Sequence, residues 1–239
     1  MPLQPSVLNR LLRTLQPSDY ALIAPNLHWM AIAKGTVLEH PTRRSSRVVF
    51  IETGIVNKSI LGPGDLWVNA GMIGYEGMTG RSVILGTPYS SYRVQADVEA
   101  EGWSVEAHLF RRALQNSSSL RELMMTYVQS EDVQRDYDLI VATSHLLLAR
   151  VARWLLMYAD RLKVDSVAVT HVTMASILNV RRASISSTLK RLEDTKTIQV
   201  SRGSIRILSR ESLIACANGT YGVAESAFER MIDATRRID

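Results

Sequence analysis

The stretch that decides the fold is 170–208, THVTMASILNVRRASISSTLKRLEDTKTIQVSRGSIRIL. Its first half predicts two short helices that cross at a tight turn. Met174 and Leu178 lie one helical turn apart and form an apolar stripe, while Ala175 is small enough for a second helix to pass closely. Asn179 follows where such a turn needs a left-handed backbone, which asparagine adopts more readily than most residues. The pattern therefore predicts a helix-turn-helix.

The second helix of this unit has an apolar face and a cationic face. Val180 fills the turn, and the apolar stripe resumes at Ile185, Leu189 and Leu192 with a period of about 3.6 residues. If the helix docked on DNA by its N-terminal end, its polar face would point into a major groove. Arginine can contact the O6 and N7 atoms of guanine together, whereas serine and lysine serve phosphates. The candidate DNA-contacting residues on this face are Arg181, Arg182, Ser184, Ser187, Lys190 and Arg191.

The second half of the stretch predicts a small β-hairpin, or wing. Apolar residues alternate with polar ones on either side of the turn 201–204, as in a two-stranded hairpin with one buried face. We expect Arg202, at the tip, to lie against a phosphate or to reach a minor groove.

Positive charge is concentrated in this region. Residues 181–210 contain eight lysines and arginines and two acidic residues, a net charge of +6, whereas the whole chain carries +5. A local surplus of this kind is typical of a DNA-binding surface. The alternative is an ordinary helical hairpin with a solvated charged face.

Three segments carry a resemblance to the Crp/Fnr family of bacterial transcription regulators: RVARWLLM at 150–157, LNVRRAS at 178–184 and VSRGSIRIL at 200–208. In the resemblance, Arg182 falls on the base-reading arginine of the family. The frequent acidic reader of the family aligns with Ala183, and its second arginine with Ser187. The resemblance implies a homodimer that binds a palindromic double-stranded DNA operator, with RNA polymerase as a further candidate partner.

Composition narrows the class of protein. The chain has 239 residues, 46% of them hydrophobic and 21% charged, which is a globular balance and enough for two domains. No apolar run approaches the roughly 20 residues of a membrane span, and residues 1–20 lack the core of a signal peptide. We therefore expect a cytoplasmic protein with no membrane partner.

Neither a cofactor nor an enzymatic site is predicted. The single cysteine, Cys216, excludes an internal disulfide and the set of thiolates that an iron–sulfur sensor needs. The five histidines are scattered without metal-ligand spacing, and there is no phosphate-binding loop or serine-centred motif. We expect no cofactor, no metal and no catalysis.

The segment 28–105 predicts a domain of short strands. Alternating runs are broken by glycine and proline, a pattern that favours an antiparallel barrel or roll. A helical face precedes it at 6–15, and a second short helix runs from 17 to 27. The predicted strands are 37–38, 48–51, 55–56 with 59–60, 66–68, 83–85, 92–96 and 102–105.

This order of elements resembles the cyclic-nucleotide-binding β-roll of the same family. The segment 71–78 falls on the loop that holds the nucleotide in the family. The resemblance therefore implies that Glu76 binds a ribose hydroxyl and that Gly74 belongs to the backbone of the nucleotide-binding loop. The arginine that anchors the phosphate has no counterpart, because the family's Arg-Ser/Thr-Ala motif aligns with Ser90, Ser91 and Tyr92. Its loss would remove a charge-assisted contact of roughly 1.5–3 kcal/mol, so we expect cyclic AMP not to be the effector. Three alternatives stay open for the roll: it binds no cyclic nucleotide, it binds another small ligand, or it binds a cyclic nucleotide or dinucleotide. Arg81 or Arg93 could then supply a substitute charge.

A long helix is predicted after residue 116. Apolar residues recur from Leu120 to Val141 at intervals of three and four, although 129–135 is polar all round. Such a helix favours a seam with a twin helix, and the family uses this element as its homodimer interface. The alternative is a single helix that lies across the roll.

A second apolar helix, 145–162, precedes the helix-turn-helix, and two further helices follow the wing at 210–216 and 223–232. The predicted architecture is α+β, with a β-roll domain at 1–115, a dimerisation helix at 116–143 and a winged helix-turn-helix domain at 144–239. The predicted function is a homodimeric, sequence-specific transcription regulator that is not gated by cyclic AMP. The alternative function is a ligand-binding regulatory module whose helix-turn-helix contacts a protein, and an enzyme with a site in the roll is a third possibility.

Overall fold

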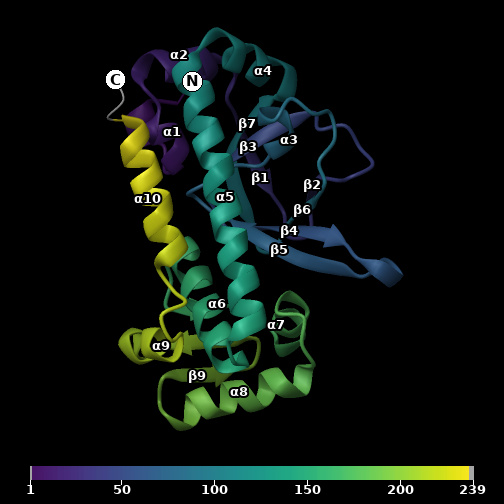
Figure 1. Cartoon of the computed structure of the whole chain (residues 1–239), viewed down its shortest axis with the longest axis vertical. Helices are drawn as coiled ribbons and strands as arrows, with labels where there is room; N and C mark the ends of the chain where they lie inside the picture. Colours follow the sequence, from purple (N-terminus) through teal and green to yellow (C-terminus); the bar gives the residue numbers. More distant parts are fainter. Residues whose placement is uncertain (1, 237–239) are drawn as a thin grey trace.

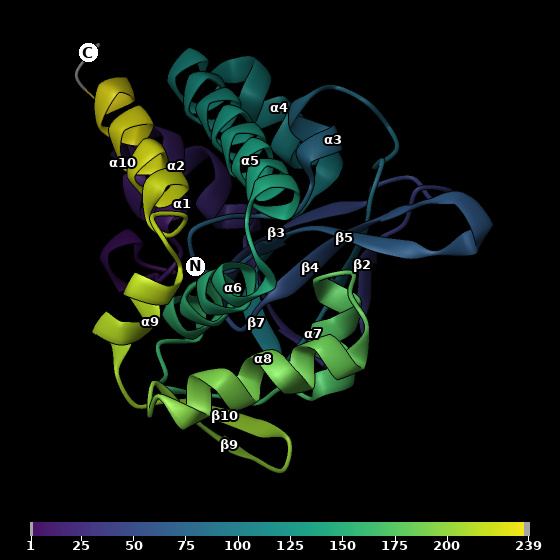
Figure 2. The same ribbon diagram turned by 60° about the horizontal axis from the view of Figure 1, so that its bottom comes forward.

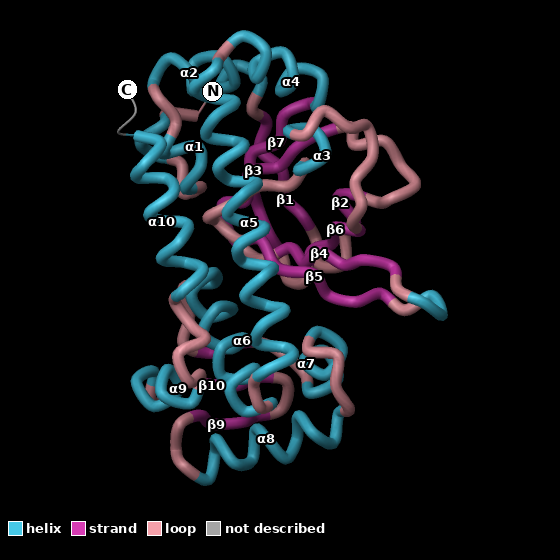
Figure 3. Tube along the Cα trace, viewed as in Figure 1, coloured by secondary structure: helices cyan, strands magenta, loops and turns pink. Residues whose placement is uncertain are grey.

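The computed structural model describes residues 2–236. A strand-rich roll occupies one end of the molecule and a compact helical domain the other, and one long helix, α5 (Ser118–Ser144), connects them (Figures 1 and 3). The C-terminal helix α10 (Val223–Arg236) runs back along α5 toward the roll (Figure 1). The predicted α+β class, with roll, long helix and winged helix-turn-helix, is confirmed.

The roll consists of two antiparallel sheets. One has the order β1-β7-β3 and the other the order β2-β6-β4-β5. Apolar side chains between the sheets, among them Val49, Ile51 and Val94, are at most 2% exposed, which explains the alternation in the sequence. The strands are β1 (His28–Ile32), β2 (Val37–Glu39), β3 (Arg47–Thr53), β4 (Val56–Leu61), β5 (Trp67–Ile73), β6 (Arg93–Ala96) and β7 (Ala100–Glu106). A turn of 3-10 helix, η3 (Pro63–Asp65), lies at the tip of the β4–β5 hairpin.

Two strand assignments differ from the sequence-based prediction. The segment 83–85, predicted as a strand, belongs largely to the helix α3 (Arg81–Ile84). Gly80 and Gly86 flank it with φ values of +88° and +77°, so the backbone turns at both ends and leaves room for one helical turn only. Strand β1 was not predicted; it pairs with β7 along its whole length.

The N-terminal helix is split, in contrast to the continuous helix predicted over 6–15. The chain forms η1 (Gln4–Ser6), α1 (Arg10–Thr14), α2 (Pro17–Ile23) and η2 (Ala24–Asn26). The interruption is explained by Glu52, whose carboxylate accepts the backbone N–H groups of Leu8 and Asn9 at 2.5 and 3.1 Å. The amide of Asn9 donates to the carbonyl of Ile51 at 2.8 Å. These bonds hold the segment extended against β3.

Helix α5 follows α4 (Ala107–Asn116) and is capped by the Ser117 hydroxyl, which accepts the N–H of Leu120 at 3.0 Å. Its 27 residues span about 40 Å. Its first apolar positions, including Met124 and Tyr127, are buried in the core of the same chain. The full stripe is therefore not available to a twin helix, and the large apolar residues that α5 exposes are Met125, Leu139 and Ile140.

The C-terminal half has a second core. Its elements are α6 (Leu147–Leu162), β8 (Ser166–Val167), α7 (His171–Ile177), α8 (Arg182–Asp194), β9 (Ile198–Ser201), β10 (Ser204–Ile207) and α9 (Arg210–Cys216). Trp154 and Leu155 of α6 pack in this core with Ile185 and Leu189 of α8. Ile55, from the turn before β4, is fully buried in the same cluster. The roll therefore contributes a side chain to the core of the helix-turn-helix.

Candidate nucleic-acid interface

The turn between α7 and α8 is fixed by local bonds. The Thr170 hydroxyl caps α7 by accepting the N–H of Thr173 at 3.1 Å. Asn179 has the predicted left-handed backbone, with φ of 51°. The next N–H, that of Val180, donates to the carbonyl of Ala175 at 3.0 Å and closes the turn. The predicted helix-turn-helix is thus present in its residue-level detail.

The inner face of α8 holds the helix in place. Ile185, Leu189 and Leu192 are at most 1% exposed, as the 3.6-residue period predicts. Arg150 of α6 supports the turn, because its guanidinium donates to the carbonyl of Leu178 at 2.5 Å. The helix is therefore anchored from beneath and from the turn before it.

The outer face of α8 carries the predicted contact residues. Five of them are exposed and Ser184 is half-buried; the exposed residues are Arg181, Arg182, Ser187, Lys190 and Arg191. In the part of the chain that the structure describes, none of the four cations here has an ion-pair partner. The helix lies across the end of the molecule farthest from the roll, with its outer face toward solvent (Figures 1 and 2). This face can receive an extended polyanion without first breaking ion pairs of its own.

The wing lies beside this helix. β9 and β10 pair with the register Ser204 to Ser201 and Ile207 to Ile198, and β8 completes a three-stranded sheet. Gly203, with φ of +76°, makes the turn, and Arg202 is exposed at its tip. The predicted wing is confirmed, and Figure 2 shows it next to α8.

The residues predicted for an effector do not form one site. Glu76 accepts the N–H of Gly74 at 3.2 Å and the Nε–H of Arg161 at 2.7 Å. A Cβ atom on Gly74 would lie 2.8 Å from Cγ of Arg161, so this arginine fills the space beside the loop. Ser90 is buried and Ser91 is exposed, and neither lines the cavity that Glu76 lines.

The two arginines considered as substitutes for the missing phosphate anchor are engaged elsewhere. Arg81 donates to the carbonyl of Val128 at 3.0 Å and pairs with Asp132 at 2.8 Å. The guanidinium of Arg93 lies 4.2 Å from the centre of the Trp67 ring. Both therefore serve contacts within the chain.

The sequence does not indicate the contacts of Arg161 and Arg150. Arg161 pairs with a residue 85 positions away, and Arg150 bonds to a backbone carbonyl 28 positions away. Neither long-range bond leaves a local pattern. The sequence places both arginines on a predicted apolar helix, and this predicts only that their side chains lie near its polar edge.

Comparisons with known proteins agree with this architecture. The model of the Crp-like helix-turn-helix domain matches residues 149–216. No curated protein sequence matches the chain.

Among residues 2–236, no helix combines the length and the apolar character needed to cross a membrane.

Several solved structures share the fold. One, from Eubacterium rectale ATCC 33656 and assigned to the Crp/Fnr family, has 19% identity and a TM-score of 0.66, and the match covers 89% of this chain and 99% of that one. A CRP-family transcriptional regulator from Thermus thermophilus has 19% identity and a TM-score of 0.67, covering 80% and 97%. FixK2 from Bradyrhizobium japonicum has 14% identity and a TM-score of 0.68, covering 80% and 96%. Residues 149–216 thus match the model of a Crp-like helix-turn-helix domain, and the whole chain shares its fold with solved structures described as Crp/Fnr-type regulators.

Proposed function

We propose that the protein is a sequence-specific DNA-binding transcription regulator that acts as a homodimer and is not gated by cyclic AMP. The observation that carries this proposal is the outer face of α8, where exposed cations have no counter-ion among residues 2–236. The match to the Crp-like helix-turn-helix domain supports the same function.

In the proposed complex, α8 enters a major groove by its N-terminal end. Arg182, in the first turn, reads a base, while Lys190, Arg191 and Arg202 contact phosphates and set the register. Two copies of α8 related by a two-fold axis would occupy grooves about 34 Å apart, which requires a palindromic operator. Arg181, Ser184 and Ser187 complete the contact surface. Contact with RNA polymerase remains a prediction from the family resemblance.

The absence of gating by cyclic AMP is supported by what surrounds Glu76. A ribose hydroxyl would have to compete with Arg161 for this carboxylate, at a bond of 2.7 Å. The phosphate would find serines at positions 90 and 91, and Arg81 already bonds to α5. A cyclic nucleotide would thus displace existing bonds and gain no cation for its phosphate.

Band-shift titration of two variants tests the base-reading assignment. The probe is a duplex selected by the purified protein from a random-sequence library, and the reference is unselected duplex. We expect Arg182→Ala to cost about 1–3 kcal/mol on the selected duplex and much less on the reference. Arg202→Ala should weaken binding to the selected and the unselected duplex equally. It should also reduce the slope of log affinity against log salt concentration by about the amount that one phosphate contact contributes. Arg112→Ala, an exposed arginine of α4 at the opposite end of the molecule (Figure 1), is the charge-matched control. Equal losses on both duplexes for Arg182→Ala would overturn the assignment.

Salt dependence separates this function from the alternative, a ligand-binding module whose helix-turn-helix contacts a protein. DNA binding releases counter-ions, so the logarithm of the affinity should fall linearly and steeply with the logarithm of salt concentration. A flat dependence, or no selected duplex at all, would favour the protein contact.

A further inference from the structure

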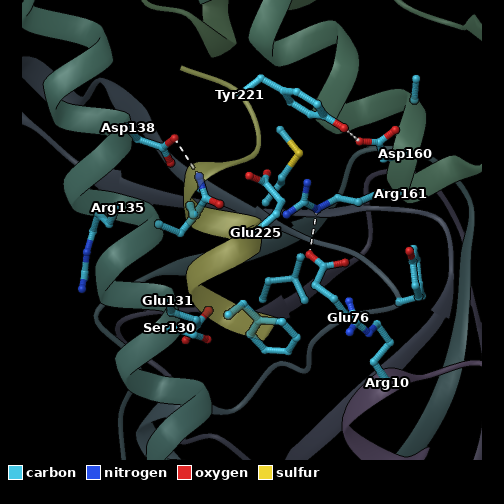
Figure 4. Close-up of a pocket in the computed structure, with 18 of the residues that line it drawn as sticks. Arg10, Glu76, Ser130, Glu131, Arg135, Asp138, Asp160, Arg161, Tyr221 and Glu225 are labelled. Atoms are coloured by element: carbon cyan, nitrogen blue, oxygen red, sulfur yellow. Dashed lines mark hydrogen bonds and ion pairs between the residues drawn. The ribbon is translucent and has the colours of Figure 1, made fainter. Parts of the chain in front are cut away.

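A cavity of about 560 Å³ lies between the roll, the middle of α5, the end of α6 and the first turns of α10. Figure 4 shows that residues from all of these elements converge on it. The volume falls in the range of sites for small molecules, roughly 300–1,000 Å³. None of the described residues that line it belongs to α8, so the cavity is separate from the exposed face of that helix.

Most charged residues that line the cavity have a partner of opposite charge. Each such pair is satisfied within the chain, so it offers little to a ligand. The pairs are Arg10 with Glu229, Lys58 with Glu131, Arg161 with Glu76, Arg210 with Asp160, and, with partners outside the lining, Asp138 with Arg153 and Arg135 with Asp132.

Glu225, in the first turn of α10, differs from these residues. Both of its carboxylate oxygens are buried, and within residues 2–236 neither accepts a hydrogen bond. Its side chain points into the cavity beside Arg161, whose Nε–H is directed at Glu76 (Figure 4). Arg161 therefore gives its printed hydrogen bond to Glu76 and leaves the Glu225 carboxylate without a hydrogen-bonded cation among residues 2–236.

The pKa of Arg161 reflects both neighbouring carboxylates. Burial lowers the pKa of Arg161, but the charges of Glu76 and Glu225 act in the opposite direction and the net pKa is raised above its ordinary value. A desolvated carboxylate without a hydrogen bond is costly, and a bound donor of positive charge would remove that cost.

Three aromatic rings, those of Tyr75, Tyr221 and Phe228, also line the cavity. A cation of the chain lies over each ring: Lys163 is 4.4 Å from the centre of the Tyr75 ring, Arg10 5.3 Å from that of Phe228 and Arg210 5.7 Å from that of Tyr221. The rings are thus engaged within the chain, and the Glu225 carboxylate is the polar group of the lining that a ligand would satisfy.

We propose that this cavity binds a small organic cation, a guanidinium or primary amine on a short carbon chain, with Glu225 as its counter-ion. The ligand class is opposite in charge to a cyclic nucleotide, and the Arg161–Glu76 pair stays intact. Because the walls come from α5, α10 and α6, the bound cation joins the long helix and the C-terminal helix to the helix that supports the helix-turn-helix.

Calorimetric titration of the full chain without DNA tests the site independently of the proposed function. The probes are butylguanidine and butylurea, which have similar shapes but differ in charge. We expect butylguanidine to bind at least tenfold more tightly than butylurea, as the loss of a charge-assisted bond predicts. Glu225→Gln should remove most of this preference, while Glu211→Gln, the same change at an exposed position of α9, should leave it within about twofold.

Equal binding of the two probes to the unmodified protein would overturn the proposal, and this comparison needs no variant. No binding of butylguanidine at about millimolar concentration, or an unchanged preference in a folded Glu225→Gln protein, would also overturn it. A protein that fails to bind DNA but still discriminates the two probes would contradict the proposed function and leave the cation site standing.

Discussion

The geometry of the DNA-facing unit depends on the backbone of one exposed residue, Asn179. Its φ of 51° costs about 1–2 kcal/mol for most L-residues, less for asparagine and least for glycine. We expect Asn179→Ala to lower the free energy of unfolding by about 1 kcal/mol and Asn179→Gly to leave it nearly unchanged, in urea titration. Asn116→Ala, at the helical end of α4, is the control and should cause no loss. Similar losses for both Asn179 variants would show that its side chain, not its backbone, matters.

A second residue, Glu39, makes stability depend on pH. It is 6% exposed; burial raises the pKa of its carboxyl, although the N–H of Gly80, at 2.6 Å, and Ser90 lower it in part. A raised folded-state pKa stabilises the protein below the unfolded pKa of glutamate, and this contribution is lost as pH rises through the folded pKa. Glu39→Gln should therefore be more stable than the unmodified protein near neutral pH and equal to it below about pH 4. Urea midpoints measured across this interval check the prediction, which a pH-independent difference would contradict.

For single residues, the sequence predicts the features that depend on neighbours along the chain. Asn179, Gly203 and the stripe of α8 follow from turn chemistry and helical period. The partner of Glu76 does not, because Arg161 comes from a separate helix and the pair exists only after the roll and α6 have packed together. Likewise no pattern marks Glu225, whose isolation results from the way α10 folds back along α5.

Among the elements, α5 shows what helical periodicity leaves open. Its apolar stripe favours a seam with a twin helix, and the N-terminal half of that stripe is buried in the core of the same chain, which leaves the rest of the helix for such a seam. Periodicity reports how many apolar residues share a face and cannot say which surface covers them. The same limit explains 83–85, where three apolar residues suit a strand or a helix equally well and the flanking glycines decide.

What remains exposed on α5 still predicts a dimer seam. Met125 and Leu139 are separated by two heptads, so they share a face, and Leu139 and Ile140 are 64% and 49% exposed. We expect the double variant Leu139→Lys, Ile140→Lys to fold and to sediment as a monomer where the unmodified protein sediments as a dimer. Ile214→Lys, at a position 42% exposed on α9, should keep the dimer. A monomeric unmodified protein, or a double variant that remains dimeric, would contradict the seam.

For the whole molecule, the important contact is the one between the roll and the helix-turn-helix. Ile55 of the roll is buried among side chains of α6 and α8. Two polar bonds also join the roll to α6: the hydroxyl of Tyr158 donates to Asp97 at 2.8 Å, and Arg161 pairs with Glu76. Burial raises the pKa of the tyrosine, and the charge of Asp97 and the hydrogen bond to it raise it further, so the bond persists through the physiological range. The two halves should therefore unfold as one unit.

Ile55→Ala tests this coupling. Removing a fully buried isoleucine side chain costs about 2–5 kcal/mol, and here the cavity would open between the halves. Three of the four tryptophans, Trp29, Trp67 and Trp103, lie in the roll and the fourth, Trp154, in the second core, so fluorescence is measured in a Trp154→Phe background to report on the roll, whereas far-UV circular dichroism reports on all the helices. We expect coincident urea transitions by both probes in this background, and a loss of coincidence when Ile55→Ala is added. Ile51→Ala, equally buried but inside the roll, should lower the midpoint without separating the probes. If the probes already disagree in the background protein, the roll and the DNA-facing half fold independently, and a signal could not pass between them through this contact.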